Sequence, residues 1–406
     1  MTRRMKGALA VLVALVGTAV LVSAAFAGSS ATPGVTKTTI TIGGTFPLTG
    51  PAALYGVIPK AENAYFQYVN AHGGVNGRKI VFKYYDDQYN PANTVPLTKK
   101  LVEQDKVFAV YGSLGTAPTL ATRDYLNAKG VPQVLVATGD SYWGAQYKKY
   151  PWTIGFQPDY PGESSIYGQF IAAKVPQAKI GVLIQDDAYG QNYYDGLIKG
   201  LGDAKSKIVD VEKYDATQTD VSQQVVKLKA AGANVFALFA LPTQTIDALV
   251  VATKVGWKPT TFINNVSASP LFMGLAIKSG ANIDGDISTA YLYDYINNPN
   301  TATSTLYKSI LSKYDAGADP NDANNIYGIA SAWTMVQALR QAGSNPTRAG
   351  LMKELTTFNH VVNPFLLTGV KLNTTPTERY PIDQQSLEHW QNGAFHPFGH
   401  IFSNAR

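Results

Sequence analysis

The stretch Thr38-Thr-Ile-Thr-Ile-Gly-Gly-Thr-Phe46 alternates β-branched residues with others, the pattern of a strand that opens a fold. Apolar residues then recur near 3.6-residue spacing from Ala53 to Ala71, which predicts a long helix closed by Gly73-Gly74. Asn76-Gly77 predicts a tight turn, and Lys79-Ile-Val-Phe-Lys-Tyr-Tyr-Asp86 predicts the next strand. This strand–helix–strand order is typical of a parallel sheet covered by helices.

The same alternation continues along the chain and restarts once. The expected elements of the first unit continue as helix 91–104, strand 107–111, helix 116–128 and strand 131–136. After Tyr150-Pro-Trp-Thr-Ile-Gly-Phe-Gln-Pro158 a second series is expected: helix 161–174, strand 179–184, helix 192–201, strand 208–214, helix 221–230, strand 234–240, helix 243–255 and strand 260–263. The sequence therefore predicts two α/β units.

The remaining residues are too few for a third unit. A strand is expected over 286–293, and helices over 301–314, 323–341 and 347–355, which would complete the first unit. The Gly/Pro-punctuated segment 365–402 is expected to return to the second unit as strands. Two lobes joined by several crossings would form a hinge around a ligand-binding cleft.

The N-terminus carries a secretion signal. Residues 1–27 have three cations, a long apolar run and the small-x-small ending Ala25-Phe26-Ala27. An uncleaved anchor is the alternative, since Gly7 to Ala27 is just long enough to span a bilayer. The Ala-x-Ala ending and the small-residue linker 28–37 favour cleavage near Ala27. We expect a mature protein that is periplasmic or secreted into the cell envelope, away from nucleotide pools.

Composition excludes several kinds of site. The chain has no cysteine, which removes disulfides, thiolate nucleophiles, thiolate metal sites and a lipid-modified N-terminal cysteine. Three of its 34 cations, Arg3, Arg4 and Lys6, lie in the signal, which leaves 31 cations against 28 anions. No Lys/Arg run is interleaved with aromatic residues, so no nucleic-acid partner is expected. The 24 tyrosines suit a wet binding cleft, or equally exposed faces of the fold.

Two loops at strand ends are candidate binding loops. In Gly112-Ser-Leu-Gly-Thr-Ala-Pro-Thr119, Thr116 is positioned as an N-cap, and free N–H groups at a helix start suit a carboxylate. An ordinary helix cap is the alternative. Ala137-Thr-Gly-Asp-Ser141 ends the next strand and should lie beside the first loop, at the sheet edge where α/β proteins bind ligands. The first loop lacks the Gly-Lys-Ser/Thr ending and the Gly-x-Gly-x-x-Gly run of phosphate-binding loops.

Catalytic motifs are missing. There is no Gly-x-Ser-x-Gly elbow and no His-Glu-x-x-His, and His396 and His400 are separated by Pro397 and Gly399, which disfavour a metal-binding helix. Asp86-Asp87 and Asp186-Asp187 could act as acid/base pairs, but solvated strand-end carboxylates explain them better. The tetrads Asp86-Asp-Gln-Tyr89 and Asp186-Asp-Ala-Tyr189 echo one another, as short matches do by chance. We expect no enzyme activity and no cofactor or metal.

Several motifs, in order and spacing, resemble one family. They are Thr45-Phe-Pro-Leu-Thr-Gly-Pro-Ala-Ala-Leu-Tyr-Gly56, Asn70-Ala-His-Gly-Gly-Val-Asn-Gly-Arg-Lys-Ile80, Tyr85-Asp-Asp-Gln-Tyr-Asn-Pro91, Asp186-Asp-Ala-Tyr-Gly190 and Val255-Gly-Trp257. From about Thr38 to the C-terminus, the chain resembles the Leu/Ile/Val-binding proteins of ABC importers. The resemblance implies a type I periplasmic-binding protein: two Rossmann-like lobes with parallel-rich sheets, a three-segment hinge, and closure on a ligand.

The resemblance also implies a ligand-binding site. The family's carboxylate-binding hydroxyl corresponds to Thr116, in the loop that also contains Ser113. The neighbouring carbonyl-and-hydroxyl loop corresponds to Ala137, Thr138 and Gly139, where Gly139 replaces a threonine. The aromatic walls correspond to Tyr55 and Tyr189, and a second tyrosine of the family corresponds to about Leu241.

One departure bears on the ligand. The family's acidic partner for an amino acid's ammonium should lie near Asn264, Asn265 or Val266, and none of these is acidic. A buried ammonium without a carboxylate is costly, so either another acid substitutes or the ligand is not an α-amino acid. We favour a small aliphatic or aromatic carboxylate or an amide, with Asn265 among its contacts.

The resemblance implies a monomeric solute-binding protein that delivers its small-molecule ligand to an ABC permease. The alternative is an extracytoplasmic sensor for the same class of ligand. The expected lobes are 38–155 plus 290–365 and 156–289 plus 366–406, after the signal peptide 1–27 and the linker 28–37.

Overall fold

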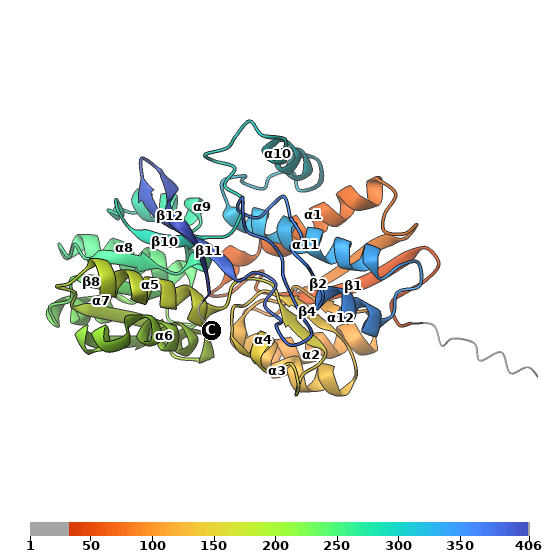
Figure 1. The fold of residues 1–406 in the computed structure, drawn as a ribbon, viewed down its shortest axis with the longest axis horizontal. Helices are drawn as coiled ribbons and strands as arrows, with labels where there is room; N and C mark the ends of the chain where they lie inside the picture. Colours follow the sequence, from red (N-terminus) through yellow and green to blue (C-terminus); the bar gives the residue numbers. More distant parts are fainter. Residues whose placement is uncertain (1–31, 405–406) are drawn as a thin grey trace, which may run out of the picture. The chain divides into compact units, whose positions relative to one another are not determined.

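A computed structural model describes residues 32–404, so the predicted signal peptide and the start of the linker lie outside the described residues. The described chain is built on two sheets with helices on both faces (Figure 1). We call the elements built on the five-stranded sheet the first lobe and those built on the seven-stranded sheet the second lobe. The predicted α/β class with parallel-rich sheets is confirmed.

The first sheet is entirely parallel, in the order β2-β1-β3-β4-β5. Its strands are β1 (Thr39–Phe46), β2 (Lys79–Asp86), β3 (Val110–Tyr111), β4 (Gln133–Val136) and β5 (Thr153–Gly155). The helices along this part of the chain are α1 (Ile58–Ala71), α2 (Pro91–Glu103), α3 (Thr116–Ala128) and the short α4 (Tyr142–Ala145). The predicted helix over 53–71 is divided into a 3-10 turn, Ala53–Tyr55, and α1, which Pro59 opens in its first turn.

The second sheet has the order β12-β11-β10-β9-β8-β6-β7, with β11 and β12 antiparallel to their neighbours. Its strands are β6 (Ile180–Gln185), β7 (Ile208–Tyr214), β8 (Val235–Phe239), β9 (Thr260–Ile263), β10 (Ile287–Ala290), β11 (Gln384–Gln391) and β12 (Ala394–Ser403). Its helices are α5 (Tyr160–Lys174), α6 (Ala188–Leu201), α7 (Ser222–Ala230), α8 (Pro242–Lys254) and α9 (Pro270–Lys278), with short 3-10 helices at Gly202–Lys207 and Asn265–Ser267.

Strand β8 is apolar at every position because helices cover both faces of the sheet. Val235, Ala237 and Phe239 belong to the core cluster with α5 and α6, whereas Phe236 and Leu238 belong to the cluster with α7, α8 and α9. Such two-sided burial requires apolar side chains at every position of the strand, as in parallel sheets generally.

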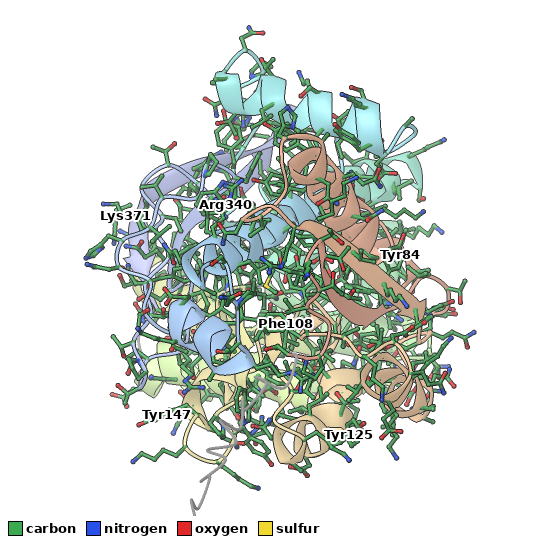
Figure 2. All side chains as sticks on the ribbon, turned by 90° about the vertical axis from the view of Figure 1, so that its right-hand side faces the viewer. Tyr84, Phe108, Tyr125, Tyr147, Arg340 and Lys371 are labelled. Carbon is green, nitrogen blue, oxygen red and sulfur yellow. The ribbon has the colours of Figure 1, made fainter. Side chains whose placement is uncertain are left out.

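Late segments of the chain pack on the first lobe and add strands to the second sheet. The helices α10 (Ala302–Tyr314), α11 (Ala323–Gln341) and α12 (Arg348–Leu355) follow β10, and α10 and α11 pack on α1 (Figure 1). Arg348 of α12 donates to the Phe108 carbonyl at 2.9 Å, which ties α12 to the first lobe. Phe108 and Arg340, the latter near the end of α11, are labelled in Figure 2. The chain then returns to the second sheet through β11 and β12.

Three segments join the lobes: after β5, after β10 and before β11. The strands predicted over 365–402 are confined to β11 and β12, because residues 365–383 form turns and isolated bridges. The helix α9 was not predicted, although Pro270 at its start is a usual helix-opening signal. Between residues 32 and 404, no helix has the length and apolar character needed to span a membrane.

Candidate functional site

A cavity of about 120 Å³ lies between the two lobes. The first lobe contributes residues such as Tyr55, Gly115 and Ala137, and the second lobe contributes others such as Tyr189 and Asn265. The volume is comparable with apolar protein cavities of about 150 Å³ that hold one benzene molecule. The cavity therefore suits a small ligand with a hydrophobic body.

Five of the nine predicted site residues line this cavity: Tyr55, Ala137, Tyr189, Leu241 and Asn265. The other four, Ser113, Thr116, Thr138 and Gly139, are not part of its lining and lie in the two loops beside it. These loops are adjacent, as expected, because the Gly115 N–H donates to the Ala137 carbonyl and the Ala137 N–H donates to the Ser113 carbonyl.

The hydroxyl groups of the loops bond to the protein itself. Thr116 Oγ1 and Thr138 Oγ1 are 2.6 Å apart, and Ser113 Oγ accepts from the Thr45 N–H at 3.1 Å. The prediction that Thr116 is an N-cap is wrong: Gly115 occupies that position with a φ of 102°, and Thr116 is the first residue of α3. A residue without Cβ is favoured there because the left-handed backbone passes against the ring of Tyr89.

Gly139 is a glycine for steric reasons. A Cβ at this position would lie 2.5 Å from the Pro158 carbonyl oxygen and 2.6 Å from the Tyr160 ring. The Gly139 carbonyl also accepts from the Tyr160 N–H at 2.7 Å. Tyr160 lines the cavity, so this contact brings a tyrosine ring close to the place where the resembled family has a threonine side chain.

An acidic residue, Glu163, lies directly behind the neutral Asn264-Asn265-Val266 stretch. Glu163 on α5 is 2% exposed, and its carboxylate accepts hydrogen bonds from the Asn265 N–H, Tyr167 and Tyr193 at 2.7–2.9 Å. Burial raises the pKa of Glu163 to about 7 against the lowering effect of those hydrogen bonds. Asn264 is also engaged, donating to the Tyr189 hydroxyl at 2.6 Å. Glu163 does not line the cavity itself, but its hydrogen bond holds Asn265, which does.

Each of the two Asp-Asp tetrads positions its tyrosine through aspartate side chains, although by different local structures. Gln88 and Tyr89 have left-handed backbones after β2, held by the side chains of Asp86 and Asp87, while Asp187 caps α6 by accepting from the Tyr189 N–H. Each tetrad thereby places its tyrosine in the cavity wall. Tyr89 was missed as a site residue, and the repeated Asp-Asp-x-Tyr pattern was the signal that could have found it.

The reading of the four aspartates as solvated carboxylates is wrong for Asp87, which is fully buried. Asp87 accepts from the Tyr89 N–H and the Thr94 hydroxyl, and burial raises its pKa to about 6. Asp186 is exposed and pairs with Lys213 at 2.8 Å. These contacts assign Asp87 and Asp187 structural roles in holding the segments that carry Tyr89 and Tyr189.

Eight tyrosines line the cavity: Tyr55, Tyr89, Tyr160, Tyr189, Tyr291, Tyr293, Tyr295 and Tyr327. The Tyr327 hydroxyl is buried without a hydrogen-bond partner in the described protein. The Tyr55 hydroxyl, also unpaired, lies near Ser267, whose own hydroxyl donates to the Ala240 carbonyl at 2.6 Å. Unpaired buried hydroxyls lining a cavity are available to a ligand.

Two acids in the wall were not anticipated. Asp294, which follows β10, and Glu388 on β11 both line the cavity, and its lining residues include no lysine, arginine or histidine. Burial and the charge of Asp294 raise the pKa of Glu388 to about 8. His396 and His400 lie on β12, and the part of the chain that the structure describes has no cluster of acids and histidines suited to a metal ion.

Hydrogen bonds cross between the lobes around the cavity. Ser269 at the start of α9 donates to Asp322 Oδ1 at 3.0 Å, and Asp322 caps α11. On another side, Asn192 of α6 donates to Asp140 at 3.3 Å and accepts from the Ser141 N–H at 3.0 Å. The described arrangement therefore has the lobes in contact.

Two sheets, three connections and a ligand-sized cavity between lobes define a two-lobed binding protein. The chain matches the family described as periplasmic binding protein over residues 39–379 and belongs to it. Membership implies an extracytoplasmic location, and the family is one of substrate-binding proteins rather than enzymes. A solute-binding role follows.

Several related proteins are named for the amino acids that they bind. The chain is 27% identical over 327 residues to Leu/Ile/Val-binding protein homolog 1 of Brucella suis, covering 80% of this chain and 84% of that one. Over 188 residues, 46% of this chain and 49% of the relative, it is 30% identical to a leucine-, isoleucine-, valine-, threonine- and alanine-binding protein of Pseudomonas aeruginosa.

Solved structures share the fold. A branched-chain amino acid ABC transporter protein of Thermus thermophilus with bound valine matches with a TM-score of 0.80 at 19% identity, covering 91% of this chain and 98% of that one. A fatty acid ABC transporter substrate-binding protein of Thermomonospora curvata matches with a TM-score of 0.77 at 21% identity, covering 92% and 94%. The named ligands of these two neighbours differ, although their fold is the same.

Proposed function

We propose that this protein is the solute-binding component of an ABC importer, which captures a small carboxylate or amino-acid-like ligand and delivers it to a membrane permease. The observation that carries the proposal is the tyrosine-lined cavity between two lobes that hydrogen bond across it. The names of the Brucella, Pseudomonas and Thermus proteins support the class of ligand.

The ligand body would lie against Tyr55, Tyr189 and Leu241, near the Ala137 loop. A hydrophobic cavity of this size suits a branched aliphatic or aromatic group. The stretch from Asn264 to Val266 offers no ionised acid facing the cavity, because Glu163 is engaged behind it. We therefore expect des-amino or aromatic acids to bind better than the matching α-amino acids.

The lobes would be 38–155 plus 290–365 and 156–289 plus 366–406, and the protein would act as a monomer after signal-peptide cleavage near Ala27. Closure of these lobes on the ligand would create the surface that the permease recognises.

Two measurements test the proposal. Native mass spectrometry of protein purified from cells should reveal a co-purified small molecule. A thermal-shift panel should then compare leucine, valine and phenylalanine with their des-amino analogues, since ligand stabilisation grows as RT ln(1 + [L]/Kd) and reaches about 2.7 kcal/mol at ~100 times Kd. A protein that carries no small molecule and responds to no member of the panel would not be a solute receptor of this class.

A further inference from the structure

The cavity has an acidic end that the proposed function does not use. Glu388 lies on β11 opposite Ser288 of β10, and Asp294 follows β10 by four residues. Both side chains belong to the cavity wall, and no cationic residue lines the cavity. The Asn297 amide donates both to Asp294 and to the Phe395 carbonyl of β12, the strand paired with β11, so the segment of Asp294 is tied to the strand pair that carries Glu388.

The Glu388 carboxyl has no partner in the described protein. None of the hydrogen bonds or ion pairs among residues 32–404 involves its side chain. Asp294 is partly engaged, accepting from the Asn297 N–H at 3.0 Å and from its amide group at 2.5 Å. A partly buried carboxyl without a partner is costly, and a bound cation would remove that cost.

A second observation in the same cavity indicates a polar ligand. Tyr327 is 5% exposed, lines the cavity, and has a hydroxyl without any hydrogen-bond partner among the described residues. A hydroxyl can accept from an ammonium as well as donate to a carboxylate. The wall therefore offers unpaired polar groups in addition to the apolar surface that holds the ligand body.

We propose that the ligand carries a protonated amine, that Glu388 and Asp294 bind this amine, and that an apolar spacer separates it from any acid group of the ligand. The inference rests on the proposed function and specifies its ligand class: an amine, or an ω-amino acid, with an apolar spacer. In an α-amino acid the ammonium would instead lie beside the carboxylate, next to the neutral Asn264–Val266 stretch.

A matched set of probes tests the proposal: pentanoate, 5-aminopentanoate and pentylamine, with leucine as the α-amino acid reference. Calorimetry on the mature protein should show the two ω-amine probes binding at least about tenfold more tightly than pentanoate and leucine. Glu388→Gln and Asp294→Asn each preserve side-chain size and should weaken the ω-amine probes by roughly 30-fold or more, as expected when a buried charge loses its partner. Pentanoate binding should not weaken in either variant.

Asp284→Asn is the control, because Asp284 is exposed on the loop before β10 and is not part of the cavity wall. Circular dichroism and melting temperature check that every variant is folded. Tighter binding of pentanoate than of the ω-amine probes, or a Glu388→Gln variant that binds them like the Asp284→Asn control, would overturn the proposal.

Failure of the amine inference is distinguishable from failure of the proposed function. If none of the probes binds, the composition of the co-purified molecule decides: an amine supports the inference, and a molecule without one overturns it while leaving the solute-binding function intact. Absence of both probe binding and a co-purified molecule overturns the function and the inference together.

Discussion

The Glu163 carboxylate accepts a hydrogen bond from the backbone N–H of Asn265 at 2.7 Å. This contact joins α5 to the loop that follows β9, and Asn265 is part of the cavity wall. Tyr167 and Tyr193 donate to the same carboxylate, so three donors hold it in place. An acidic residue thus holds a residue of the cavity wall in place without lining the cavity itself.

Glu163 should make the stability of the protein depend on pH. Its pKa is about 7 in the folded protein against 4.5 ordinarily, so the folded state holds the proton more tightly than the unfolded state. Its contribution to the free energy of unfolding is therefore present below pH ~4.5 and is lost as the pH rises through about 7. Urea unfolding between these pH values should show that the free energy of unfolding falls less with rising pH in Glu163→Gln than in the wild type.

Other buried carboxyls titrate in the same range, since the pKa values of Asp87 and Asp140 are each raised to about 6 by burial. For this reason the informative quantity is the difference between wild type and Glu163→Gln at each pH. A difference that stays constant from pH 4.5 to 8 would show that Glu163 does not titrate differently in the folded state.

Thr116→Val should weaken binding of a carboxylate ligand by ~1.5–3 kcal/mol, if its hydroxyl turns from Thr138 to the ligand on binding. Thr116→Ser keeps the hydroxyl and serves as the control, with affinity close to that of wild type. Calorimetry with the best ligand of the panel measures both. Equal affinity of the Val and Ser variants would show that the Thr116 hydroxyl bonds only to Thr138 and does not contact the ligand.

Gly139→Ala should destabilise the protein by about 1–3 kcal/mol, because its Cβ would collide with the Pro158 carbonyl and the Tyr160 ring. The displaced Tyr160 should also lower ligand affinity. Gly274→Ala is the matched control, since Gly274 lies on α9 with open space around its added Cβ. Denaturant unfolding should leave that control unchanged or up to about 1 kcal/mol more stable; a Gly139→Ala midpoint equal to it would contradict the steric account.

Much of the fold is predictable because its signals are local. Alternating and continuous apolar runs identify β1, β2, β7 and β9 with the observed bounds or within one residue, and 3.6-residue periodicity does the same for α3 and α11. The predicted ends of strands and helices are wrong where contacts outside the local apolar pattern determine where the element begins or ends. Only Val110–Tyr111 of the predicted strand 107–111 pairs as a strand, and α6 begins four residues early because Asp187 caps it.

The site is less predictable, because its wall combines segments far apart in the chain. A sequence can indicate Tyr55, Ala137 and Tyr189, because each lies in a family motif or directly after a predicted strand. Glu388 reaches the cavity only because β11 pairs antiparallel with β10, nearly one hundred residues earlier in the chain. No local pattern around it signals that pairing.

Tyr327→Phe should lower ligand affinity while leaving the fold as stable or more stable. The Tyr327 hydroxyl is buried without a partner, so its removal relieves an unsatisfied group in the free protein and removes a hydrogen bond only in the complex. We expect a loss of about 1 kcal/mol in binding. Paired melting and calorimetric measurements check this; a lower melting temperature with unchanged affinity would mean that the hydroxyl stabilises the free protein instead.

Ser269→Ala should shift the protein away from the closed arrangement. Ser269 Oγ donates to Asp322 of the first lobe and accepts from the Ala323 N–H, bonds that exist only while the lobes are together. Asp322 would still cap α11 through Asn324, so each lobe should remain folded. Because ligand binding and closure are coupled, loss of a bond to a charged group should reduce affinity by ~1.5–3 kcal/mol.

Ser279→Ala, at the exposed end of the same helix α9, is the control. Small-angle scattering should show compaction of wild type and Ser279→Ala on ligand addition, with a larger ligand-free radius of gyration for Ser269→Ala. An identical radius for all three proteins, with and without saturating ligand, would contradict hinge closure about the three segments that join the lobes, after β5, after β10 and before β11.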